Sequence, residues 1–332
     1  MVELGLLCVT QYDLDRDLDG IAGELAHQTR LADEAGFAVL GMGEHHATED
    51  HQYLLNEAAL AHVAEHVGGM DLMASMVLLP FHNPVRIAEF GATLDILTGG
   101  QFRLGVGLGY RPKEYAVFGV DRADAPGRFV EGVEIIDRLW RQDNVSYDGE
   151  HFTLDDVSIN PKPLQDPRPP LWSGASNESS VRRGAQYTDA FLGAHVPFSL
   201  AKRQVADFRD EREKQGLDPG TVGFLREAYV APTTEEAEAI VKEPLMGKYA
   251  SYSSWGQDEV IGGDQFDSEW DKLRNERFLV GTPAEVLEDI ERYTEAMDLD
   301  YLFVRTQFPG CDLEDVHRSI ELFGDEVVPH LP

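Results

Sequence analysis

The chain has 332 residues, of which 42% are hydrophobic and 9% aromatic, so it is expected to fold around a buried core. Its 60 acidic and 28 basic residues give a formal net charge of −32, and the acids are spread along the chain. We interpret this charge as a halophilic, acidic surface, with a basic partner protein as the alternative. No cluster of Lys and Arg is available to neutralise phosphates, so we do not expect nucleic-acid binding.

Neither a membrane protein nor a secreted one is expected. No apolar run approaches the roughly 20 residues of a membrane-spanning helix, and the first residues lack a secretory signal pattern. Cys8 and Cys311 are too few for a disulfide framework, which fits a reducing cytoplasm. A single β/α barrel can reach this length, so we expect one domain over residues 1–332.

Short apolar runs alternate with longer amphipathic ones from the start of the chain. Strands are predicted at residues 4–9 and 37–40, and helices at 20–35 and 54–67. The motif Glu44-His45-His46 follows the second strand directly. This alternation predicts β/α units around a parallel sheet.

The stretch 73–119 organises the rest of the chain. A strand at 73–79 is followed by a helix that starts at Pro84 and stops at Gly99-Gly100. A second strand then runs into the glycine-rich turn at 105–109, where open α/β sheets and β/α barrels bind ligands. The turn reads Gly-x-Gly-x-Gly, and Pro112 is expected to interrupt any immediate helix. The pattern therefore does not match a Rossmann dinucleotide fingerprint.

The middle of the chain contains a second possible ligand-binding turn. A helix at 128–140 is followed by a loop-rich segment at 144–170, with a turn at Asp148-Gly149. Leu171-Trp172 then leads into the small polar residues 173–177 and a further helix. Such a junction can bind an anion through free backbone N–H groups, or can simply provide an ordinary helix cap.

The last third of the chain continues the alternation. Residues 244–277 show no clear period and are predicted to form an irregular lid insertion. Thr282-Pro283-Ala284-Glu285 is a strong helix start. Further strands are predicted at 190–194, 221–230 and 301–306, and helices at 200–215, after Thr233 and at 313–328. About eight strand–helix units predict an α/β fold of the (β/α)₈ TIM-barrel type, with a doubly wound sheet as the alternative.

Histidines are the candidate catalytic residues. His45 and His46 lie after a strand, where either proton transfer or plain hydrogen bonding is possible. His62-Val-Ala-Glu65-His66 matches a zinc-peptidase signature, with both imidazoles on one helical face. Zinc would need a third protein ligand, so we favour two solvated or interface histidines over a zinc hydrolase and expect no metal.

An ordered series of motifs resembles the bacterial luciferase-like flavin monooxygenase family. It comprises Glu44-His45-His46, Ser75-Met76-Val77-Leu78-Leu79-Pro80, Asn83-Pro84-Val85-Arg86, Gly100-Gln101-Phe102-Arg103-Leu104-Gly105 and Val117-Phe118-Gly119. The resemblance implies a (β/α)₈ barrel with a flavin at the C-terminal ends of its strands. It also implies a non-prolyl cis peptide at Ser75–Met76 behind the flavin ring.

The resemblance further implies roles for particular residues. His45 matches the catalytic His beside the reactive edge of the flavin, and Glu44 orients it or contacts the cofactor. The flavin phosphate is expected against Gly174, Ala175, Ser176 and Asn177. Further expected cofactor contacts are Ser75, Met76, Gly109, Tyr110, Arg111 and Ser180. Leu108 stands where luciferase has a phosphate-binding Arg, so Arg111 or backbone N–H groups would replace it.

Two cofactors remain open within this resemblance. Use of reduced FMN with dioxygen implies a monooxygenase whose reduced FMN is supplied by a partner flavin reductase. We favour this interpretation. The 5-deazaflavin coenzyme F420 implies hydride transfer without oxygen activation, and a non-catalytic flavin-binding protein is a further alternative. The substrate would be a small organic molecule, and relatives of this kind imply a homodimer.

Overall fold

The computed structural model describes residues 2–194, 196–256 and 269–332 as a closed parallel barrel. Its eight strands, in spatial order, are β1 (Glu3–Cys8), β3 (Val39–Met42), β5 (Asp71–Leu78), β6 (Phe102–Gly107), β9 (Leu171–Gly174), β10 (Ala190–Ala194), β11 (Thr221–Val230) and β13 (Tyr301–Arg305). β13 pairs with β1 and β10 pairs with β11, so the ring has no open edge. This closure confirms the predicted TIM barrel and rules out the doubly wound sheet.

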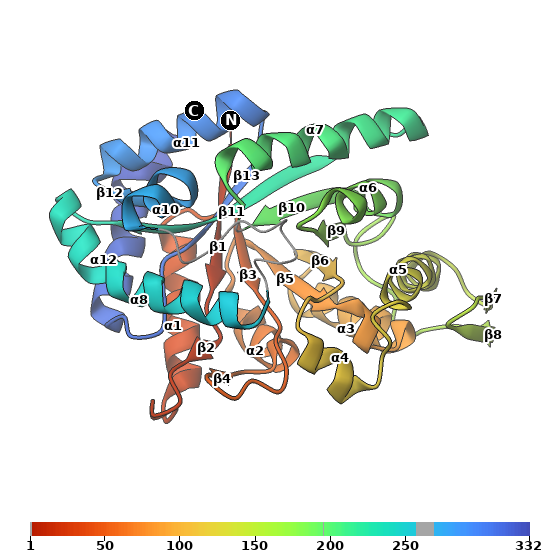
Figure 1. Cartoon of the computed structure of the whole chain (residues 1–332). Coiled ribbons are helices and arrows are strands. Elements are labelled where there is room, and N and C mark those ends of the chain that lie inside the picture. Colours follow the sequence, from red (N-terminus) through yellow and green to blue (C-terminus); the bar gives the residue numbers. More distant parts are fainter. Residues whose placement is uncertain (1, 195, 257–268) are drawn as a thin grey trace.

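Helices surround the strands, and the two ends of the chain lie side by side (Figure 1), where the Val2 amide donates to the Pro332 carbonyl at 3.1 Å. The helices are α1 (Ile21–Glu34), α2 (Asn56–Val63), α3 (Pro84–Leu97), α4 (Pro112–Phe118), α5 (Ala125–Arg141), α6 (Glu178–Tyr187), α7 (Phe198–Gln215), α8 (Thr234–Ser254), α10 (Trp270–Arg277), α11 (Pro283–Met297) and α12 (Leu313–Leu322). Within the described ranges, none of them is both long enough and apolar enough to cross a bilayer.

Side chains fill the barrel interior and close its N-terminal end. The interior cluster consists of Leu7, Val39, Met73, Trp172, Ala190, Leu192, Leu225 and Phe303. Below it, Arg103 donates to Asp71 at 2.6 Å and lies 4.6 Å from the centre of the Tyr301 ring. The barrel is therefore a packed core at this end, and a cavity can open only at the other end.

Local sequence signals explain where several helices begin and end. The Asn83 side chain accepts from the Val85 amide at 2.9 Å, and Pro84 is the first residue of α3. Gly99 and Gly100 follow α3 with positive φ angles, which Gly adopts without strain. At α11, Thr282 and Glu285 form the predicted capping box.

Two local predictions were wrong, and one was incomplete. Pro112 does not interrupt a helix but occupies the first position of α4, where its missing N–H costs nothing. The loop-rich segment contains an antiparallel hairpin of β7 (Val145–Asp148) and β8 (Thr153–Val157), turning at the predicted Asp148-Gly149.

The second error concerns the irregular structure expected at 244–277, whose role as a lid stays a prediction. The segment 244–277 is helical at both ends, because α8 continues through Pro244 to Ser254 and α10 ends at Arg277. The prediction for residues 257–268 lies outside the described residues. A short strand that the sequence did not reveal, β12 (Phe278–Gly281), follows α10 and pairs with the end of β11.

The buried carboxylate of Asp95 holds the long connection that leads into β9. Asp95, on α3, is fully buried. Its Oδ2 accepts from the amides of Leu164 and Gln165 at 2.5 and 3.0 Å, and its Oδ1 accepts from the Gln165 side chain at 2.6 Å. Hydrogen bonds to a charged group are stronger than neutral ones, so this contact fixes how the chain enters β9.

We predict that Asp95→Ala lowers the free energy of unfolding by about 3 kcal/mol, because three donors lose a buried charged acceptor. Urea unfolding measures the change. Asp33→Ala is a milder control, since Asp33 accepts from the exposed Gly69 amide. Equal stability of Asp95→Ala and the wild type would contradict this role for Asp95.

Candidate active site

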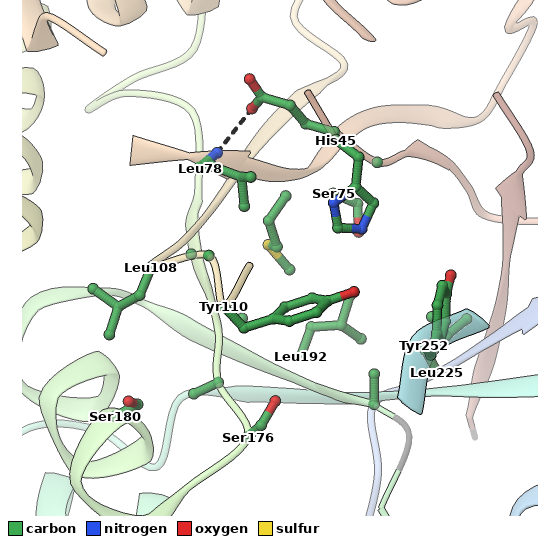
Figure 2. A pocket seen from close by; sticks show the side chains of 18 of the residues that line it. His45, Ser75, Leu78, Leu108, Tyr110, Ser176, Ser180, Leu192, Leu225 and Tyr252 are labelled. Atoms are coloured by element: carbon green, nitrogen blue, oxygen red, sulfur yellow. Dashed lines mark hydrogen bonds between the residues drawn. The ribbon is translucent and has the colours of Figure 1, made fainter. Parts of the chain in front are cut away.

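A cavity of about 420 Å³ opens at the C-terminal ends of the barrel strands. Figure 2 shows His45 and Ser75 on one side of it, Ser176 and Ser180 on another, and the Tyr110 ring between them. The predicted site residues that line it are Glu44, His45, Ser75, Met76, Gly109, Tyr110, Gly174, Ala175, Ser176, Asn177 and Ser180. Residues from turns far apart in the sequence therefore meet in one cavity, as the barrel topology requires.

The base of the cavity is formed where β5, β6 and β9 come close together. The Ser75–Met76 peptide bond is cis, as the family resemblance implied. The Met76 side chain lies against Gly105 and Gly174, where an added Cβ would come within 2.4 Å of the Met76 sulfur and 2.7 Å of its Cγ, respectively. Both positions therefore require Gly for this packing.

His45 is held by the buried carboxylate of Glu114, from α4. The His45 Nδ1 atom lies 3.0 Å from Glu114 Oε1, which also accepts from the His46 amide at 3.0 Å. Burial alone would raise the pKa of Glu114, but the hydrogen bond and charge of His45, the His46 amide and the Arg111 charge together outweigh it and lower that pKa. An ionised Glu114 favours a proton on Nδ1, so Nε2 is the nitrogen left free.

Aromatic rings surround the His45 imidazole. Ring centroids lie 5.3 Å away for Tyr53, 5.7 Å for Tyr110 and 5.5 Å for Trp255. Trp255 follows α8 directly and donates to Asp50 at 3.0 Å, so the end of this helix covers the imidazole. His45 is thereby shielded from bulk water while remaining on the cavity wall.

Glu44 has a structural role, unlike its neighbour His45, which is the candidate catalytic residue. Its Oε2 accepts from the Leu78 amide at 2.8 Å, and its Oε1 contacts Nε2 of both His46 and His82, the latter at 2.8 Å. Burial alone would raise the pKa of Glu44, but the hydrogen bonds from His46 and His82 lower it to about 2. Burial would lower the pKa of His46, whereas Glu44 raises it. These contacts fix the loop that carries His45 to the end of β5.

Glu44, His46 and His82 are also the one group of three potential metal ligands within the described ranges. Imidazole N–H groups that donate to one carboxylate oxygen explain this close approach without an ion. His62 instead contacts the Ala22 carbonyl at 2.8 Å, and the described residues bring no third ligand to it and His66.

The opposite part of the cavity is suited to an anion. Asn177 caps α6 by accepting from the Ser180 amide at 3.0 Å, so the positive end of the helix faces the cavity beside Ser176. Arg183, one turn further along α6, also lines the cavity. Among the described residues no hydrogen bond or ion pair engages its guanidinium, and burial lowers the pKa of Arg183. An unpaired cation at a helix N-terminus is a suitable phosphate site.

Sequence reasoning missed Arg183 and misplaced Arg111. The Arg111 guanidinium donates to the His46 carbonyl at 2.9 Å, lies 4.3 Å from the Trp255 ring centre, and is not part of the cavity wall. Arg183 could have been found, because it lies three residues after Ser180 on the predicted helix. Glu114 gave no such signal, since it is 69 residues from His45 in the chain.

The cavity also has a wall at β1 and β13 that no sequence motif indicated. It is formed by Gln11, Tyr53, Tyr252 and Arg305. Gln11 and Tyr53 are paired in the short ribbon of β2 (Gln11–Tyr12) and β4 (Gln52–Tyr53). Tyr252, on α8, hydrogen-bonds with Arg305 at 3.3 Å. This wall faces the anion site across the barrel mouth, because β1 and β9 lie four strands apart in the ring of eight.

The chain belongs to the luciferase-like monooxygenase family, whose model matches residues 2–299. A 4-hydroxyprotoasukamycin monooxygenase of Streptomyces nodosus subsp. asukaensis is 34% identical to it, over 90% of this chain and 83% of the relative. The oxygenase component of a flavin-dependent trigonelline monooxygenase of Acinetobacter baylyi is 29% identical, over 92% and 89%. These matches confirm the family predicted from the motifs.

Solved structures with this fold contain either of the two expected cofactors. The oxygenating constituent of a Pseudomonas putida 3,6-diketocamphane monooxygenase, in complex with FMN, matches with a TM-score of 0.85 at 19% identity, covering 100% of this chain and 99% of that one. An F420-dependent secondary alcohol dehydrogenase, with an F420–acetone adduct, matches with a TM-score of 0.81 at 19% identity and the same coverage. At this identity the likeness establishes the fold alone.

We predict that the stability difference between the wild type and Glu44→Gln depends on pH. The folded pKa of Glu44, about 2, is below its ordinary value of 4.5, so its contribution is fully present above about pH 5 and is lost as the pH falls toward 2. The shift corresponds to a contribution on the order of 3 kcal/mol. Unfolding by urea between pH 3 and 7 measures it.

The control is Glu57→Gln, which removes an ion pair with the exposed Arg86 and should cost less than about 1 kcal/mol. A difference between wild type and Glu44→Gln that stays constant from pH 7 to pH 3 would contradict the role of Glu44.

Proposed function

We propose that the protein is the oxygenase component of a two-component monooxygenase, which binds reduced FMN and uses dioxygen to oxidise a small organic substrate. The observation that carries this proposal is a cavity that joins Arg183, whose guanidinium has no partner among the described residues, to a shielded His45. FMN is the cofactor in the matched diketocamphane enzyme, and the trigonelline relative is named as an oxygenase component. A separate reductase would therefore supply the reduced cofactor.

The residues present fit a phosphorylated flavin. Ser176, Ser180 and the first backbone N–H groups of α6 would hold its phosphate together with Arg183. The Tyr110 hydroxyl oxygen is buried on the cavity wall and has no partner among the described residues. Burial raises the pKa of Tyr110, so the hydroxyl keeps its proton and is free to donate to a polar ligand.

Bound reduced FMN would supply the electrons and the centre at which dioxygen is activated. His45 would hold or release a proton at Nε2 beside that centre, while Glu114 fixes the imidazole orientation through Nδ1. Tyr53, Tyr110 and Trp255 would exclude water around the imidazole. Glu44 would keep the loop rigid without taking part in proton transfer, because its pKa is about 2.

The alternative is an F420-dependent oxidoreductase that transfers hydride and does not activate oxygen. It is favoured by the matched F420-dependent alcohol dehydrogenase and by a 26% identical F420-dependent glucose-6-phosphate dehydrogenase of Microbacterium testaceum. The same cavity, phosphate site and imidazole would serve this chemistry. The two functions differ in whether the bound cofactor reacts with dioxygen.

We predict that His45→Ala binds reduced FMN with an affinity within about threefold of that of the wild type. The variant should no longer couple the reaction of FMN with dioxygen to oxidation of the substrate. Loss of a positioned proton donor or acceptor typically costs 10²-fold or more. Bound FMN should then return to its oxidised form at least about tenfold faster, with release of hydrogen peroxide. Stopped-flow absorbance with a peroxide assay measures both quantities.

Arg183→Gln is the matched control, because it alters the other end of the cavity. It should weaken FMN by about tenfold or more, leave riboflavin affinity unchanged, and re-oxidise like the wild type once saturated with FMN. Unchanged re-oxidation and peroxide yield in His45→Ala would remove His45 from the mechanism.

A further inference from the structure

A buried ionic cluster lies behind the β13 wall of the cavity and has no part in the proposed proton transfer. It consists of Glu227 on β11, Lys248 on α8 and Arg305 at the end of β13. Lys248 donates to Glu227 Oε1 at 2.5 Å, and Arg305 lies 3.4 Å from the same oxygen. Lys248 and Glu227 are only 2% and 1% exposed.

The cluster places two cations against one carboxylate. Within the described ranges, Glu227 is the one acidic residue in contact with Lys248 or Arg305. Burial and then repulsion from Arg305 lower the pKa of Lys248 to about 7, against the attraction of Glu227. Lys248 is the closer partner of the shared oxygen, at 2.5 Å against 3.4 Å for Arg305, so the Arg305 guanidinium keeps N–H groups that a further anion can accept from.

Arg305 is the member of this cluster that reaches the cavity. It lines the wall together with Tyr252, whose hydroxyl lies 3.3 Å from its Nη1. Gln11 lines the same wall, and its Nε2 is buried without a partner among the described residues. A guanidinium and an unpaired amide N–H₂ on one wall are donors for an anionic oxygen pair.

We propose that the wall formed by Gln11, Tyr252 and Arg305 is a substrate subsite that binds a carboxylate group of the molecule to be oxidised. The inference rests on the proposed function, because the opposite end of the cavity is assigned to the cofactor phosphate. A carboxylate at Arg305 complements a guanidinium that shares its ion-pair oxygen, 3.4 Å away, with the closer Lys248. It also gives the Gln11 amide an acceptor, and it leaves the rest of the substrate beside His45 and its aromatic neighbours.

The test compares carboxylates with neutral compounds of matched shape. Acetate, benzoate and nicotinate are each paired with their amides, and tryptophan fluorescence reports binding both to the FMN-loaded protein and to the protein without FMN. We expect at least one carboxylate to bind about tenfold or more tightly than its amide. We expect Arg305→Gln to abolish this preference.

Arg305→Gln is chosen because it leaves Lys248 and Glu227 as a balanced buried pair, so the fold should persist. Thermal unfolding checks this, and Arg305→Lys, which keeps the charge, should retain part of the preference. Arg183→Gln is the second control, and it should weaken FMN while leaving carboxylate binding unchanged. If Arg305→Gln does not fold, Gln11→Leu takes its place and should reduce the carboxylate preference.

The outcomes separate this inference from the proposed function. Carboxylate binding that depends on Arg305 in a protein that does not bind FMN would support the subsite and refute the monooxygenase. If FMN binds tightly but carboxylates bind no better than their amides, the subsite is overturned and the proposed function stands. The same holds if the carboxylate preference survives in Arg305→Gln. Inorganic phosphate that binds at Arg305 more tightly than every carboxylate would overturn the inference in favour of a phosphorylated substrate.

Discussion

The constraint on which the molecule depends is closure of the parallel strand ring. The pairings of β13 with β1 and of β10 with β11 leave no free edge, and they bring the carboxyl ends of eight strands to one rim. Because the opposite end is filled by interior side chains and closed by Arg103, a ligand can enter only at this rim. Every residue assigned to the site follows from this geometry.

Buried carboxylates position the chain segments that strand pairing alone does not constrain. Glu44, Asp95 and Glu114 each accept from two or more donors. Glu44 and Glu114 hold the loop that carries His45, and Asp95 holds the connection that leads into β9. Their hydrogen bonds give these three acids a positioning role, because each one fixes the chain segment that donates to it. By contrast, the Tyr110 hydroxyl and the Arg183 guanidinium have no partner among the described residues and lie on the cavity wall, where a ligand would complete their contacts.

Much of this arrangement could be predicted from the sequence, because local signals dominate where they are strong. The cap at Asn83, the stop at Gly99-Gly100 and the capping box at Thr282 are contacts between near neighbours in the chain. The contact of His45 with Glu114 joins residues 69 apart, and the contact of Arg305 with Glu227 joins residues 78 apart, so no local pattern reveals either. The prediction that Pro112 interrupts a helix was wrong for a related reason. A proline can either break a helix or begin one, and the orientation of the preceding turn decides which.

The central claim is that this cavity binds reduced FMN and lets it react with dioxygen under the control of His45. An anaerobic titration in high salt with reduced FMN and, separately, with reduced F420, followed by admission of air, tests it most directly. We expect tight FMN binding, weak F420 binding, and re-oxidation of the bound FMN through a transient absorbance that free FMN does not show. Binding of F420 alone, with no reaction in air, would contradict it and identify a hydride-transferring enzyme on the same barrel.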